Sequence, residues 1–378
     1  MTPMDLGAKP GEGWHLMDLG VARLSFNRQG GDSGGSALES VNWNMVHAGR
    51  ALGPGRLSLM LMSSLEPVTF SKLGSRELFQ TGESYRGQPL VDRQHPHDFF
   101  MNLSATYRLA LGSDAGAWIQ AAPVGEPALG PTAFMHRASA GENLTAPLGH
   151  HWQDSTHIAF HVVTAGAGWK WIAVDASAFR GEEPDEHRWD IEAGRIDSAS
   201  ARIRIFLPSG WSGQVSHGFL KNPEPLEPGD THRTTASLSF GADGERSFAA
   251  TLLWGRNTER HGSSDAYLIE GAWQATASDQ VYARAELVWK NEDLLLTKLE
   301  TGSTRLARVG ALTLGYLREF GVLRGIRSGI GADVTAYTFP AALDRVYGRS
   351  PISAHAYLRI RWGSSHMEGH AGHAGMKM

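Results

Sequence analysis

The sequence predicts an all-β protein, a closed, antiparallel, up-and-down transmembrane β-barrel of about 16 strands, within a range of roughly 12 to 18. Three observations predict this fold. Apolar and polar residues alternate with a period of two along most of the 378 residues, short and long connections alternate between the predicted strands, and no apolar run approaches the length of a membrane-spanning helix.

The alternation is clearest in residues 55–66, where leucines at every second position share one face and polar residues or methionines share the other. An ordinary domain is about a quarter strand, and this chain far exceeds that share. The predicted strands are residues 14–27, 40–51, 55–66, 103–111, 115–123, 155–164, 168–180, 197–206, 210–220, 233–242, 246–257, 266–276, 280–290, 304–319, 325–338 and 352–362.

The connections alternate in length along the chain. Even-numbered strands are followed by short turns, which we place at residues 52–54, 112–114, 165–167, 207–209, 243–245 and 277–279. Every odd-to-even connection is longer, roughly eight to forty residues, and such a barrel has short turns in the periplasm and long loops outside. We therefore expect a protein of the cell outer membrane, in contact with the lipid bilayer, with both termini in the periplasm.

The faces of the strands support a wet lumen and a lipid-facing exterior. Charged residues at mid-strand alternate with apolar ones and would point inward, namely Arg202, Arg204, Arg284, Glu286, Arg327, Asp333, Arg359 and Arg361. Tryptophans near strand ends suit the two membrane interfaces, namely Trp14, Trp43, Trp169, Trp211, Trp254, Trp289 and Trp362. We divide the chain into an extension (1–13), the barrel (14–362) and a flexible tail (363–378).

The first long connection, residues 67–102, carries the first candidate metal site. Pro96 holds the local chain extended, so His95 and His97 can face the same way as a pair of imidazole ligands. Asp98 lies beside them and could bind or orient a ring. The alternative for this stretch is a hydrogen-bonded loop that binds no ligand.

The second long connection, residues 124–154, adds more imidazoles, and we expect both loops to fold into the lumen, because long connections of this kind are usually functional. In the strand that follows, Ile158, Phe160 and Val162 would face lipid and leave His157 and His161 pointing inward. Chance clustering in a histidine-rich barrel is the alternative. The candidate metal ligands of both loops and nearby strands are His95, His97, Asp98, His136, His150, His151, His157, His161, Met60 and Met62.

The C-terminal tail contributes three further candidate ligands, His366, His370 and His373, spaced among methionines and small residues. Imidazole with thioether and no thiolate favours copper, and zinc or nickel could bind imidazole alone. In the periplasm this tail could exchange metal with a periplasmic carrier. The alternative is a solvated tail, since Gly-Ser-Ser-His-Met is typical of a vector remnant.

Several runs resemble those of a largely uncharacterised family of bacterial outer-membrane barrel proteins. They are DRQHPHDFF, PTAFMHR, APLGHHWQDSTHI, GEEPDEHRWD and HRTTAS. The histidine and methionine tail is more distantly similar in kind to the copper-resistance outer-membrane protein B family. These resemblances imply an outer-membrane location and copper handling, carried here by His95, His97, His136, His150, His151 and His157.

The first functional hypothesis is therefore an outer-membrane pore or channel that handles a transition metal, and copper is the metal we expect. The alternative is a general small-solute porin without a specific metal site. A second alternative is a hydrolase that uses Ser155 with a nearby histidine, but consecutive strand residues seldom form a triad, so we expect no enzyme. The net charge of −4 argues against nucleic acid as a partner, and the lack of cysteine excludes thiolate sites.

Overall fold

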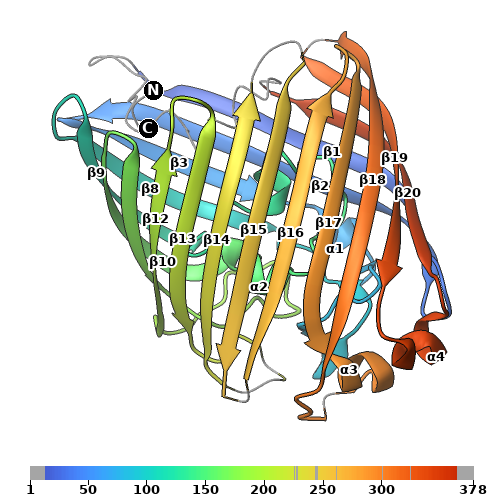
Figure 1. Cartoon of the computed structure of the whole chain (residues 1–378). Coiled ribbons are helices and arrows are strands. Elements are labelled where there is room, and N and C mark those ends of the chain that lie inside the picture. The colour runs from blue at the N-terminus through green and yellow to red at the C-terminus, as the bar shows by residue number, and fades with distance from the viewer. Residues whose placement is uncertain are drawn as a thin grey trace.

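The computed structural model describes residues 13–363, apart from 225, 227, 228, 243–245, 261, 300 and 324. Sixteen strands of this described part form one closed antiparallel barrel, in which β1 (His15–Gln29) closes against β20 (Ile352–Trp362) (Figure 1). Each remaining strand pairs with its neighbours along the chain. The predicted fold class is confirmed.

Each predicted segment overlaps a strand of this wall, and the segment 168–180 also includes the end of β10. The strands between β1 and β20 are β2 (Gly35–Leu52), β3 (Gly55–Ser63), β8 (Phe100–Ala110), β9 (Ala115–Gly125), β10 (Ala159–Trp169), β11 (Ile172–Phe179), β12 (Ser198–Phe206), β13 (Trp211–Leu220), β14 (Thr231–Ala242), β15 (Phe248–Glu259), β16 (Gly262–Gln274), β17 (Asp279–Asn291), β18 (Leu306–Leu323) and β19 (Ile326–Thr338). In β1, Leu24 and Phe26 are exposed on the outside, whereas Arg23, Ser25 and Asn27 are buried inside. Apolar side chains therefore face outward, as lipid requires.

Three predicted connections are wrong. Residues 165–167 lie inside β10, and the turn falls at Lys170 and Trp171, where Lys170 adopts a left-handed φ of 50°. Gly166 is small because a Cβ there would lie 2.1 Å from the Trp118 ring. Two outer connections are shorter than predicted. Only residues 30–34 join β1 and β2, and between β15 and β16 the strand pairing continues to Glu259 and Gly262. The turn predicted at residues 243–245 lies outside the described residues.

The predicted faces of β10 are also wrong. Phe160 and Val162 are 0% exposed and point inward, whereas Val163 is 42% exposed on the outside. Ile158 precedes the strand and is buried. Because this segment is apolar at consecutive positions, its alternation does not specify which face meets lipid.

Two long segments lie inside the barrel. The first inner loop, residues 64–99, contains α1 (Glu66–Thr69), β4 (Ser75–Arg76), β5 (Glu83–Tyr85), β6 (Gln88–Leu90) and β7 (Arg93–Gln94). The second inner loop, residues 126–158, contains η1 (Phe134–His136), α2 (His150–Gln153) and η2 (Ser155–His157). Figure 1 shows α2 within the ring of strands. The outer connections carry α3 (Glu292–Thr297), η3 (Ala341–Leu343) and α4 (Asp344–Tyr347).

None of the described helices is long and apolar enough to cross a membrane.

The inward charges hold the second inner loop instead of facing open water. Arg284 of β17 donates to the backbone carbonyl of Thr145 (2.9 Å), and Glu286 of the same strand accepts the backbone N–H of Leu148 (2.5 Å). Glu142 of this loop pairs with arginines of the wall, namely Arg23, Arg359 and Arg361. A buried charge needs partners to offset its desolvation, so the charged side chains of the wall and the polar groups of the loop act as each other's partners.

Candidate functional site

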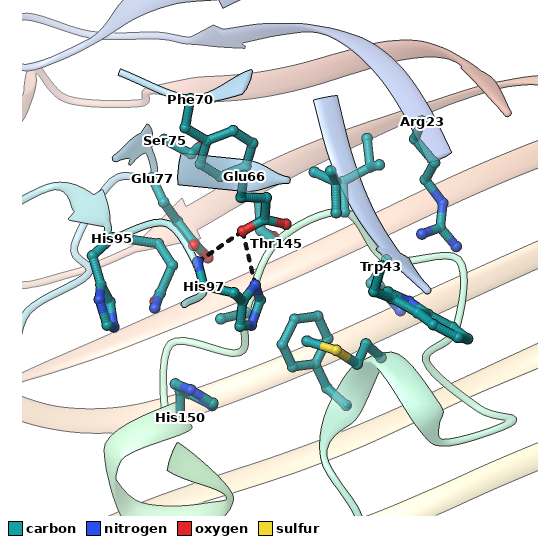
Figure 2. A pocket seen from close by; sticks show the side chains of 17 residues that line it. Arg23, Trp43, Glu66, Phe70, Ser75, Glu77, His95, His97, Thr145 and His150 are labelled. Atoms are coloured by element: carbon teal, nitrogen blue, oxygen red, sulfur yellow. Dashed lines mark hydrogen bonds and ion pairs between the residues drawn. The ribbon is translucent and has the colours of Figure 1, made fainter. Parts of the chain in front are cut away.

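His97 is held by Glu66, which begins α1. The Glu66 Oε2 atom accepts the backbone N–H of His97 (3.0 Å) and lies 2.8 Å from its Nδ1 atom, as Figure 2 shows. Burial alone would lower the pKa of His97, but the Glu66 charge and hydrogen bond raise it above its ordinary value. The pair therefore favours imidazolium against carboxylate.

Glu83 joins the two inner loops. Its Oε1 atom lies 3.0 Å from His95 Nε2 and 3.6 Å from His151 Nε2, and His151 Nδ1 lies 3.2 Å from Glu183 in the outer loop, residues 180–197. Burial lowers the pKa of His95 to about 4. Burial opposes charging of His151 too, but Glu183 and Glu83 raise its pKa to about 10. Neighbouring imidazoles thus differ in charge.

A buried ion network fixes the second inner loop. Asp154 lies 2.7 Å from His150 Nδ1 through one carboxylate oxygen and accepts a hydrogen bond from Arg137 Nη1 (2.5 Å) through the other. Arg137 also donates from Nε to Glu270 of β16 (2.6 Å). Burial raises the pKa of Asp154, but the charge of Arg137 and the hydrogen bond with His150 together hold it below its ordinary value. Arg137 therefore joins the loop to the wall.

Three imidazoles meet where the loops touch. The ring centroid of His157 lies 5.4 Å from that of His97 and 5.2 Å from that of His150, and His157 Nδ1 lies 2.9 Å from the backbone oxygen of Asp154. Burial, followed by the charges of His150 and His97, lowers the pKa of His157 to about 3. Within the described residues, no group of three or more His, Cys, Asp or Glu side chains could hold a metal ion.

Other candidate ligands lie apart from this trio. Asp98 accepts a hydrogen bond from Arg188 of the outer loop (3.0 Å). His136 packs edge-on against Trp43 with ring centroids 4.8 Å apart. Trp43, which we expected at a membrane interface, is instead buried inside the barrel.

His161 and the two methionines are also separate from the loop histidines. His161 Nε2 lies 2.9 Å from the backbone oxygen of Glu192 in the outer loop, and His161 adopts a left-handed φ of 54° within β10. Met60 and Met62 pack in an apolar cluster with Phe160. His366, His370 and His373 lie outside the described residues.

Ser155 is a hydrogen-bonding residue between three segments. Its hydroxyl donates to Glu183 (3.0 Å) and accepts from Arg233 of β14 (2.8 Å). His157 uses its Nδ1 atom on the backbone of Asp154 and His161 contacts Glu192. These contacts do not arrange a serine nucleophile beside a histidine base.

Two adjoining cavities lie between the inner loops. The larger encloses about 580 Å³ of empty space, its openings included, and the smaller about 360 Å³. Gln94, His95, His97 and His150 line both. Figure 2 shows His95 and Glu77 on one side of the larger cavity, with Arg23 and Trp43 on the other.

Sequence reasoning missed the partners that fix the histidines. These are Glu66, Glu83, Arg137 and Glu183, and each is buried or nearly so. Charged residues within long connections were the available signal, because a carboxylate or guanidinium in a loop that enters a lumen needs a counter-charge. This signal identifies charged loop residues that need a partner, but it does not show which residue the partner is.

No family model matches the sequence, and no curated protein is similar to it in sequence. Solved structures are similar in fold. An anion-selective porin from Comamonas acidovorans superposes with a TM-score of 0.58 at 10% identity, covering 93% of this chain and 100% of that chain. The chain has the fold of an outer-membrane porin. OprB of Pseudomonas putida is also similar, with a TM-score of 0.57 at 9% identity, covering 93% of this chain and 94% of that chain. The outer-membrane channel DcaP of Acinetobacter baumannii has a TM-score of 0.51 at 9% identity, covering 95% of this chain and 99% of that chain.

Proposed function

We propose that this porin-like barrel conducts small polar solutes through the two cavities between its inner loops. The observation that carries the proposal is that His95, His97 and His150 line both cavities. The smaller cavity also touches the outer loop through Glu183 and Arg188. A solute that enters beside the outer loop would pass these imidazoles to reach the larger cavity.

The passage is narrow and pre-arranged. Carboxylates orient His95 and His97 through both backbone and ring contacts, so neither imidazole is free to rotate without losing a buried hydrogen bond. A fixed constriction of this kind selects by size and polarity.

Planar-bilayer recording and liposome swelling with the purified full-length chain test the proposal. We expect steady single-channel conductance and a clear change in it for His97→Ala, because a side chain is removed from the passage. His217→Ala, an exposed histidine of β13, is the matched control and should leave conductance unchanged. A folded barrel that conducts no ions and passes no small solute would refute the proposal.

Metal handling is the second candidate, and one observation favours it. Every methionine in the described part of the chain belongs to a single apolar cluster. Met17, His47 and Met60 occupy paired positions on β1, β2 and β3, and none of the three is fully exposed. Thioether with imidazole favours copper over zinc or nickel, and a periplasmic carrier would be the natural partner.

Metal analysis of the purified protein separates the two candidates. Copper that stays bound after dialysis and is lost on Met17→Leu with Met60→Leu would support metal handling. The matched change Met101→Leu, within the same cluster, should retain the metal. Conductance without retained metal would support the small-solute channel and exclude metal handling.

A further inference from the structure

Five residues that line the larger cavity each carry a buried polar side-chain atom that has no hydrogen-bond partner among the described residues. These atoms are Nε of Arg23, Nε1 of Trp43, Oε2 of Glu77, Nδ1 of His95 and Oδ1 of Asn143. Arg23, Trp43, Glu77 and Asn143 are each more than nine-tenths buried. Buried polar groups are nearly always hydrogen-bonded, so five such atoms around one cavity indicate a polar occupant.

The five atoms include both donors and acceptors. Arg23 Nε and Trp43 Nε1 can only donate. Asn143 uses its amide nitrogen on the backbone oxygen of Ala140 (3.4 Å), which leaves its Oδ1 as an acceptor. His95 contacts Glu83 through Nε2, so its Nδ1 can accept. Hydroxyl groups suit such a lining because each can donate and accept at once.

The charges around the cavity are balanced or suppressed. Burial raises the pKa of Glu77 to about 8, although Arg284 opposes the shift, and burial lowers the pKa of His95 to about 4. Both side chains are therefore uncharged near neutral pH. Arg23 faces Glu142 at 3.3 Å and Glu66 faces His97. This lining favours an uncharged ligand, since a charged one would lose its hydration without gaining a free counter-charge.

Aromatic rings supply the apolar part of the lining. Trp43, Phe70 and Phe134 all line the cavity. A sugar-like ring carries C–H groups on its faces and hydroxyls at its edge, so it can contact aromatic rings and polar atoms together.

We propose that the larger cavity binds an uncharged, polyhydroxylated small molecule, about the size of one sugar ring, as it passes along the channel. The inference rests on the proposed channel function and names its substrate class. The ring lies against the aromatic side chains, while its hydroxyls accept from Arg23 and Trp43 and donate to Asn143 and His95.

Isothermal titration of the full-length barrel in detergent tests the site with D-glucose, myo-inositol and gluconate. We expect saturable binding of one or both neutral probes and at least tenfold weaker binding of gluconate. Trp43→Phe keeps an aromatic ring at this position but removes the Nε1–H donor. Asn143→Leu removes the Oδ1 acceptor. Each should weaken binding at least fivefold, whereas Trp169→Phe, an exposed tryptophan of β10, should not change it.

Three results would overturn the inference. These are no saturable binding of a neutral probe, equal or tighter binding of gluconate, and unchanged affinity in both cavity variants, with heat-modifiable gel mobility showing that each barrel is folded. The polar atoms would then be satisfied by water alone. Bilayer recordings on the same preparations keep the two proposals separate, because conductance without binding refutes only the ligand class, whereas absent conductance and solute flux refute the channel.

Discussion

The strand wall and the two inner loops are stabilised by different interactions. The wall is a continuous backbone ladder, as between β1 and β2, which pair from His15 with Gly49 to Gln29 with Gly35. The inner loops depend on a few buried side chains, such as Arg284 on the carbonyl of Thr145 and Arg137 between Asp154 and Glu270. A side-chain substitution can therefore release a loop while the wall stays closed.

The largest effect should come from Arg137→Met. Removing one partner of a buried ion network costs roughly 3–5 kcal/mol, because Asp154 and Glu270 are left without their shared counter-charge. We expect the second inner loop to leave the lumen and single-channel conductance to rise, with heat-modifiable gel mobility unchanged. Arg318→Met, at an exposed pair with Asp279, is the control. Unchanged conductance in a folded Arg137→Met barrel would contradict the claim that a loop can be released while the wall stays closed.

The opposite behaviour is expected for the wall. Ile269 of β16 is 56% exposed on the outer face, and arginine on a lipid face costs roughly 2–4 kcal/mol at mid-membrane. Ile269→Arg should lower the free energy of unfolding measured by urea titration in vesicles while leaving the conductance of the folded fraction unchanged. Ile269→Val is the control. A change in conductance would show that wall and loops are coupled.

A rise in pH should loosen the first inner loop, because Glu77 loses its proton. Burial raises the pKa of Glu77 to about 8, although Arg284 opposes the shift. The docked loop is therefore favoured at low pH, where Glu77 is protonated. It loses stability as the pH rises from the ordinary pKa of a glutamate through about 8. Conductance should be higher at pH 9 than at pH 6, and Glu77→Gln should flatten this difference. Glu186→Gln, in the outer loop, should retain the wild-type pH dependence. An unaltered pH profile for Glu77→Gln would exclude this carboxyl as the cause.

Ser155→Ala should have the smallest effect. It removes one hydrogen bond each from Glu183 and Arg233, and a typical hydrogen bond contributes about 1 kcal/mol. Hydrogen exchange should increase modestly in the second inner loop. A serine-reactive fluorophosphonate should not label the wild-type chain, and labelling lost on Ser155→Ala would restore the hydrolase hypothesis.

The wall was predictable because its signals are local. A period of two and short turns identify strands, and sixteen of them close into the expected barrel. The prediction failed in β10, where apolar residues at consecutive positions, including Phe160, Val162 and Val163, do not distinguish the two faces.

The candidate site was predictable only in part. Histidine-rich runs located the region where His97, His150 and His157 meet. Their partners are set by the tertiary structure, since Glu66 lies 31 positions before His97, and Arg137 lies 133 positions before Glu270. No local pattern connects such pairs, so the sequence indicated the histidines but not the carboxylates and the arginine that hold them.

A disulfide between loop and wall tests the central claim most directly, because the native chain has no cysteine. Ser139 of the second inner loop and Thr251 of β15 have side-chain oxygens 2.8 Å apart. In Arg137→Met carrying Ser139→Cys and Thr251→Cys, oxidation should form the bridge and return the raised conductance to the wild-type level, and reduction should raise it again. Failure to form the bridge in the folded barrel, or a bridged barrel that conducts as freely as the reduced one, would contradict the account.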